Sequence, residues 1–232
     1  RAFATPLFAA AGLDAKAVSV HIVNDRTLNA FVAGGQRIFI NTGLILAVDS
    51  ASEILGVLAH ESGHIIGGHL IRTREAMESA NTQSIIAMIL GMAAIVGSKG
   101  DVGSAVISGG GHVAQRSLLR YSRIQESIAD QSAIRIMAKA NYAPDGMLAM
   151  LQKLRGQETL ITSRQDPYVR SHPLTSDRIT TMREAVAKAG PGQDISHFET
   201  MLARMKAKIY AYMEDPVRTF RRYPESDRSV AG

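Results

Sequence analysis

The 232-residue sequence contains no cysteine and no tryptophan. The absence of cysteine excludes disulfide bonds, thiolate nucleophiles and every zinc site that depends on cysteine ligands. Long apolar runs are also absent. Residues 84–97 form the most apolar segment, which is too short for a membrane-spanning helix of about 20 residues. The chain begins with Arg1 rather than Met, so we expect a fragment or a processed product.

What is present is an ordinary globular composition, with 46% hydrophobic and 20% charged residues. The formal net charge of +5 raises the question of nucleic-acid binding. However, the basic residues are spread along the chain, and their densest cluster, at 218–222, lacks a recognisable nucleic-acid-binding motif. We therefore expect no nucleic-acid partner, and a basic surface facing anionic lipid is the better interpretation.

The segment His60-Glu61-Ser62-Gly63-His64 lies inside an apolar run and has the pattern HExxH. An α-helix turns about 100° per residue, so His60 and His64 share one face, one turn apart. Two imidazoles in this arrangement can bind one Zn²⁺, and Glu61 can reach a water on that metal. The alternative is a chance match, which occurs in about one chain in a hundred of this length.

A capping-box pattern at Ser50 and Glu53 predicts that this helix begins near Ser50 and runs to about Glu75. Glycines within it lower its helix propensity by about 1 kcal/mol each, so packing must stabilise it. These glycines are Gly56, Gly63, Gly67 and Gly68. On a continuous helix His69 would lie about 180° from His60, so we predict that His69 faces away from the metal.

A catalytic zinc needs a third protein ligand. The metzincin pattern requires a histidine at position 70, where this chain has Leu70. A better candidate is Glu126, which lies four residues before Asp130 in a helix predicted over 117–140. This spacing places both carboxylates on one face. We interpret Glu126 as the third ligand and Asp130 as the acceptor that orients a ligand histidine.

A β-branched alternating segment at 18–23 predicts a strand, and two further strands flank the turn at Gly34-Gly35. We expect the second strand of this hairpin to form the edge of the sheet. Its residues are Arg37, Ile38, Phe39, Ile40 and Asn41. An extended peptide substrate would pair with this edge by β-addition.

The remaining pattern is helical, so the predicted fold class is α+β, mainly helical, with a small β-sheet beside the HExxH helix. Further helices are predicted from Pro144 to about Leu154, from Ser176 to Gly190, and from Ser196 to about Met213. We expect a catalytic domain over 1–213, followed by a basic tail over 214–232.

Residues 84–111 have two interpretations. They form either a helical hairpin buried against the core, or an apolar flap that docks on a membrane surface. Periodicity does not distinguish these alternatives.

The motifs at 60–64 and 126–130 resemble the minigluzincin peptidases, the family of HtpX and the CAAX prenyl protease. Other stretches, spread over about residues 1–190, are similar to further motifs of that family, in the same order. They are Asn29-Ala30-Phe31 with Gly34-Gly35, Thr42-Gly43-Leu44, and Ser171 to Ile179. The resemblance implies a metalloprotease domain that binds one Zn²⁺ through His60, His64 and Glu126, with Glu61 as the general base and acid.

Within the family, the chain is most similar to the soluble BepA-type peptidases. This resemblance implies a periplasmic location, peripheral to a membrane, and zinc-dependent cleavage of unfolded or misassembled outer-membrane proteins. It also implies that residues 214–232 are the truncated start of a tetratricopeptide-repeat domain. The alternative functions are a latent chaperone-like binding protein and a membrane-peripheral adaptor with little proteolysis.

The resemblance also singles out His172 and Arg178. His172 has two possible roles: it hydrogen-bonds the tetrahedral oxyanion, or it occupies the fourth position of the zinc and keeps the enzyme latent. Arg178 is expected to pair with a carboxylate or with the substrate backbone.

Overall fold

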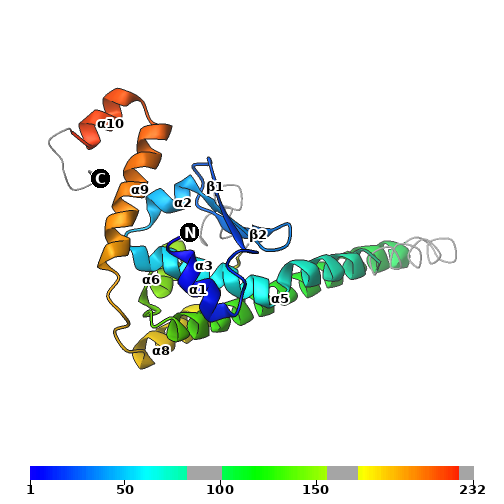
Figure 1. Ribbon diagram of the computed structural model, residues 1–232. Coiled ribbons are helices and arrows are strands. Elements are labelled where there is room, and N and C mark those ends of the chain that lie inside the picture. The colour runs from blue at the N-terminus through cyan, green and yellow to red at the C-terminus, as the bar shows by residue number, and fades with distance from the viewer. Residues whose placement is uncertain (83–100, 156–171, 225–232) are drawn as a thin grey trace.

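The computed structural model describes residues 1–82, 101–155 and 172–224, with the backbone alone over 101–119. The described part is mainly helical with one small sheet, which confirms the predicted fold class (Figure 1). Its elements are α1 (Ala4–Ala11), β1 (Ser19–Val23), β2 (Ala30–Ala33), β3 (Arg37–Asn41), α2 (Thr42–Ala47), α3 (Ala51–Ile66), α5 (Asp101–Lys139), α6 (Asp145–Arg155), α8 (Ser176–Lys188), α9 (Ser196–Met213) and α10 (Pro216–Arg222).

The sheet has the strand order β1-β3-β2, so β3 lies in its centre. Strand β3 pairs in parallel with β1 and antiparallel with β2, across the Gly34-Gly35 turn. The prediction that residues 37–41 form a sheet edge is therefore wrong. The hairpin pattern identifies the antiparallel neighbour correctly, but a parallel neighbour has no local turn signal that a sequence pattern could reveal.

Helix α3 lies in the middle of the fold, packed against α1, α5 and α6. Every residue from Ala51 to Gly63 is buried. The helix begins where the capping pattern predicts, but the Ser50 side chain makes no cap hydrogen bond. Instead, the backbone N–H of Ala51 donates to Glu199 Oε1 on α9, over 2.8 Å.

The predicted continuous helix from Ser50 to Glu75 is interrupted. Helix α3 ends at Ile66, and Gly68 has a left-handed φ of 61°, a conformation that glycine adopts at little cost. A second helix then covers 69–82. The two glycines therefore end the helix, although the apolar pattern continues beyond them.

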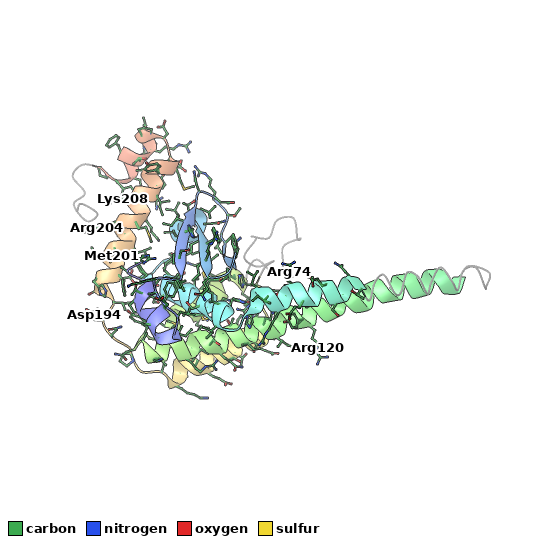
Figure 2. The ribbon with its side chains drawn as sticks, turned by 45° about the vertical axis from the view of Figure 1, so that its right-hand side comes forward. Arg74, Arg120, Asp194, Met201, Arg204 and Lys208 are labelled. Carbon is green, nitrogen blue, oxygen red and sulfur yellow. The ribbon has the colours of Figure 1, made fainter. Side chains whose placement is uncertain are left out.

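The helix over 69–82 lies beside α5, and together they form a long arm that projects from the rest of the fold (Figure 1). Figure 2 shows Arg74 on one helix of this arm and Arg120 on the other. Helix α5 covers Asp101–Lys139, so residues 101–111, which precede the helix predicted over 117–140, are also helical. The rest of the 84–111 segment, residues 84–100, lies outside the described residues. Among the described helices, none is long and apolar enough to span a membrane.

Helix α9 lies on the side of the fold away from the helical arm (Figure 2). Figure 2 labels Met201, Arg204 and Lys208 on this helix and Asp194 just before it. Its Phe198 stacks on Phe3, with ring centroids 4.7 Å apart, and both rings are buried. Helix α9 therefore belongs to the same packed core as α1 and α3. No observation tests the predicted boundary at residue 213, which stays a prediction.

Candidate metal centre

Four side chains from three parts of the chain converge on one point. His60 and His64 come from α3, Glu126 comes from α5, and His172 precedes α8. Each offers one ligand atom, and these atoms all lie within 4.8 Å of one another. His60 Nε2 is 3.0 Å from His64 Nε2 and 3.3 Å from Glu126 Oε2. Imidazole nitrogens and a carboxylate oxygen are the donors of a catalytic zinc site without cysteine.

Close packing of α3 against α5 brings Glu126 to the two histidines. A Cβ atom added to Gly63 would lie only 2.7 Å from the carbonyl oxygen of Ala129. Any larger residue at position 63 would push α3 and α5 apart. The glycine inside HExxH thus sets the distance between the two histidines of the motif and Glu126.

His172 contributes its Nδ1 atom to the cluster, 3.2 Å from both oxygens of Glu126. Its other nitrogen, Nε2, lies 3.1 Å from the carbonyl oxygen of Ala30 on β2. Since a carbonyl can only accept, this contact places a proton on Nε2, so a neutral His172 ring would present its Nδ1 lone pair to a metal held by the other donors.

Glu61 is completely buried beside the cluster. Its Oε1 lies 3.5 Å from His172 Nε2, and among the described residues neither carboxylate oxygen has a hydrogen-bond partner. A buried carboxylate without donors is costly in free energy. Such an orphaned carboxylate fits a site in which its partner is a water held by a metal.

Asp130 and Arg178 contact members of the cluster without belonging to it. Asp130 Oδ1 lies 2.9 Å from His60 Nδ1, the nitrogen that faces away from the other donors. Arg178 contacts Asp130 and also places Nη1 3.0 Å from Glu126 Oε2. The structure thus places Arg178 against carboxylates, one of the two environments expected for it.

The electrostatics of the cluster favour a bound cation. Burial lowers the pKa of His60, but contacts with Asp130 and Glu126 outweigh burial and raise that pKa to about 10. Burial raises the pKa of Glu126, yet His172, His60 and His64 together hold it well below its usual value. Carboxylates that retain a proton on a buried imidazole this firmly also stabilise a metal ion. The residues present therefore fit a divalent cation.

His69 is not where the sequence predicted it to be. It is 3% exposed, and its Nδ1 lies 2.8 Å from His64 Nδ1. The prediction that His69 faces away assumed a continuous helix, but the break at Gly67-Gly68 turns His69 back towards the site. The Gly67-Gly68 pair was the sequence signal for this break, because glycine readily adopts the left-handed conformation that ends a helix.

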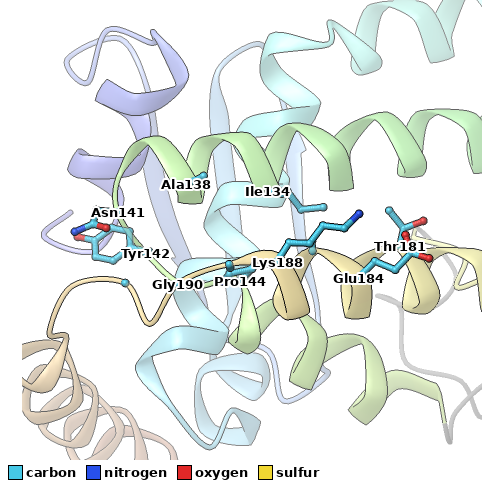
Figure 3. A pocket seen from close by; sticks show the side chains of 12 residues that line it. Ile134, Ala138, Asn141, Tyr142, Pro144, Thr181, Glu184, Lys188 and Gly190 are labelled. Carbon is cyan, nitrogen blue, oxygen red and sulfur yellow. The ribbon is translucent and has the colours of Figure 1, made fainter.

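A separate cavity of about 510 Å³ lies between α5 and α8 (Figure 3). Ile134 and Ala138 line it from α5, and Thr181, Glu184 and Lys188 line it from α8. None of its lining residues belongs to the four-residue metal cluster.

The chain is similar in sequence to known proteins over most of its own length. A Vibrio cholerae protein named as a beta-barrel assembly-enhancing protease is 30% identical over 80% of this chain and 38% of its own length. The beta-barrel assembly-enhancing protease of Yersinia pestis is 26% identical, with the same two coverages. The mitochondrial metalloendopeptidase OMA1 of Schizosaccharomyces pombe is 24% identical over 79% of this chain and 51% of its own length.

The chain therefore spans about two fifths of the length of the two bacterial relatives. The sequence model of peptidase family M48 matches residues 2–186, which include all four clustered donors and Glu61. On this match, the chain belongs to peptidase family M48.

Proposed function

We propose that this chain is a zinc-dependent endopeptidase that hydrolyses peptide bonds in unfolded or misassembled proteins. The observation that carries the proposal is the cluster of His60, His64, Glu126 and His172, all buried except the half-buried His64, with the orphaned carboxylate of Glu61 beside it. Membership of a peptidase family supports it. The donor set suits one Zn²⁺ per chain.

A bound zinc would lower the pKa of its water towards about 7 and polarise the scissile carbonyl. Glu61 accepts the proton of the attacking water and passes it to the leaving amine, work that contributes about 10²–10⁴ in rate. Asp130 holds the His60 ring in the orientation that a ligand needs, and Arg178 holds Asp130.

We further propose that the arrangement described here is the latent form. The Nδ1 atom of His172 lies 3.3 Å from His60 Nε2 and 3.2 Å from both oxygens of Glu126, so on a bound metal it would fill the position that a reacting water needs. Of the two roles that the sequence leaves open, this geometry supports the blocking one. Activation then requires His172 to leave the cluster.

Substrate binding at β2 offers a route to that movement. Strand β2 pairs only with β3 among the described strands, so it replaces β3 as the candidate for β-addition. His172 already uses the carbonyl of Ala30 on this edge. An extended peptide that pairs with β2 would compete for that carbonyl. Hydrogen exchange should show protection of residues 30–33 by a bound peptide, and protection at β1 alone would contradict the assignment.

The names of the bacterial relatives support a role in the cell envelope. Two of them are named for enhancing beta-barrel assembly. We extend this to the chain as a proposal: a periplasmic enzyme, peripheral to a membrane, that acts on misassembled outer-membrane proteins.

The test is cleavage of unfolded casein by the purified chain, with and without zinc, alongside Glu61→Gln. We expect cleavage that a chelator abolishes and zinc restores. Glu61→Gln should bind one zinc per chain, as measured by elemental analysis, without cleaving. Proteolysis by zinc-loaded Glu61→Gln would overturn the role of Glu61. Casein binding without cleavage by the zinc-loaded wild-type and His172→Ala proteins would instead support a chaperone-like function.

A further inference from the structure

We propose that His69 is a positioning residue for the metal centre: its Nδ1 atom accepts a hydrogen bond from His64 and thereby fixes His64 as a ligand. This inference rests on the proposed zinc site. It assigns a role to a histidine that the HExxH motif does not contain and that lies outside the four clustered donors.

The geometry of the two rings supports a directed contact. The Nδ1 atoms of His64 and His69 are 2.8 Å apart, within hydrogen-bond distance. The ring planes are nearly perpendicular, at 79°, with centroids 4.9 Å apart, so the rings meet by their edges instead of stacking. His69 is buried, so water does not compete for the contact.

The direction of this hydrogen bond follows from the role of His64. A neutral imidazole carries one proton, and a ring that binds metal through Nε2 must carry it on Nδ1. The Nδ1–H of His64 then needs an acceptor, and His69 Nδ1 is the atom in place. The other nitrogen of His69 has no hydrogen-bond partner among the described residues, so no further contact there sets the tautomer of this ring.

The two zinc histidines would therefore have chemically different supports. His60 faces the carboxylate of Asp130 over 2.9 Å, whereas His64 faces a neutral imidazole. A carboxylate or a backbone carbonyl is the usual partner of a metal-bound histidine. His69 does the same work without adding a second negative charge behind the cluster.

The backbone is built to place His69 there. On an unbroken helix, a residue five positions after His64 would lie about 140° away from it. The turn at Gly67-Gly68 removes that separation, and a Cβ atom on Gly67 would lie 2.3 Å from His69 Nε2. The side-chain amide of Gln125 on α5 donates to the carbonyl of His69, over 3.3 Å, and fixes the new helix start.

Two variants test the inference by zinc affinity, measured by competition with a chromophoric chelator. His69→Phe keeps a ring but removes the acceptor, and we expect it to weaken zinc binding about 10–100-fold. His69→Asn keeps an acceptor oxygen close to the position of Nδ1, so we expect an affinity within about threefold of the wild type. Circular dichroism and thermal unfolding establish that each variant is folded.

Equal zinc affinity of folded His69→Phe and wild type would overturn the proposal. So would equal losses in both folded variants, because the ring itself would then matter, not the acceptor. Nitrogen NMR of the zinc-loaded wild type gives a readout that needs no variant: His69 should carry its proton on Nε2, and a proton on Nδ1 would also overturn the proposal. If the wild type binds no zinc, the proposed zinc peptidase function is wrong. If the wild type binds zinc and the variants show either of the contrary results above, only the role of His69 is wrong, so the two results are distinguishable.

Discussion

Arg178 holds both carboxylate oxygens of Asp130, with Nε 2.6 Å from Oδ2 and Nη2 2.9 Å from Oδ1. The same guanidinium donates to the carbonyl of Pro173, over 2.9 Å, directly after His172 in the chain. One buried arginine therefore connects the support of His60 with the segment that carries His172. Its planar fork suits this bidentate geometry, which a lysine could not reproduce.

Replacing Arg178 with alanine should destabilise the fold strongly. The change removes the buried guanidinium that pairs with Asp130 and Glu126, and breaking such a buried pair costs about 3–5 kcal/mol. Urea unfolding of the metal-free protein measures this loss. Arg74→Ala is the matched control, because the exposed Arg74–Glu78 pair should contribute less than about 1 kcal/mol. Equal losses in the two variants would contradict the structural role of Arg178.

His172→Ala should cleave casein faster than the wild type at saturating zinc. The variant removes the fourth donor and opens a position for water. The exposed His197 provides a control, and His197→Ala should leave the rate unchanged. A slower rate in His172→Ala would favour the oxyanion role instead, and an unchanged rate would refute both roles.

Zinc binding at pH 7 should release about one proton or more per ion. Because the pKa of His60 is raised to about 10, the metal-free site carries a proton that zinc must displace. Titration calorimetry in two buffers of different ionisation enthalpy measures this number. Identical heats in both buffers would show that no proton leaves, contrary to expectation.

The same pKa shifts predict how the stability of the metal-free protein depends on pH. The raised pKa of His60 contributes stability that is fully present below pH 6.5 and is lost as pH rises through about 10. The pKa values of Glu126 and Asp130 are lowered in the folded protein. These two groups therefore contribute stability when the pH is above the ordinary pKa of a carboxyl group, and this contribution is lost as the pH falls through their folded-state pKa values. Unfolding curves from pH 3 to pH 10 should therefore show a maximum between these limits, and a monotonic trend would contradict it.

Local periodicity in the sequence predicts much of the candidate site. The i, i+4 spacings of His60 with His64, and of Glu126 with Asp130, each describe one helical face, and the two faces meet in the structure. The predictions for β3 and His69 fail because both depend on tertiary structure. No tight turn joins the parallel strands β1 and β3, so no local sequence pattern predicts their pairing. His69 depends on whether Gly67-Gly68 ends a helix, which packing against Gln125 helps to decide.

The family match ends at residue 186, but the packing described above continues beyond it. Phe198 packs on Phe3 in the core, and Glu199 accepts a hydrogen bond from the first N–H of the helix that carries His60 and His64. The region of shared sequence is thus shorter than the region that stabilises the site. A truncation designed on the sequence match alone would remove α9, uncap α3 and expose a buried aromatic stack.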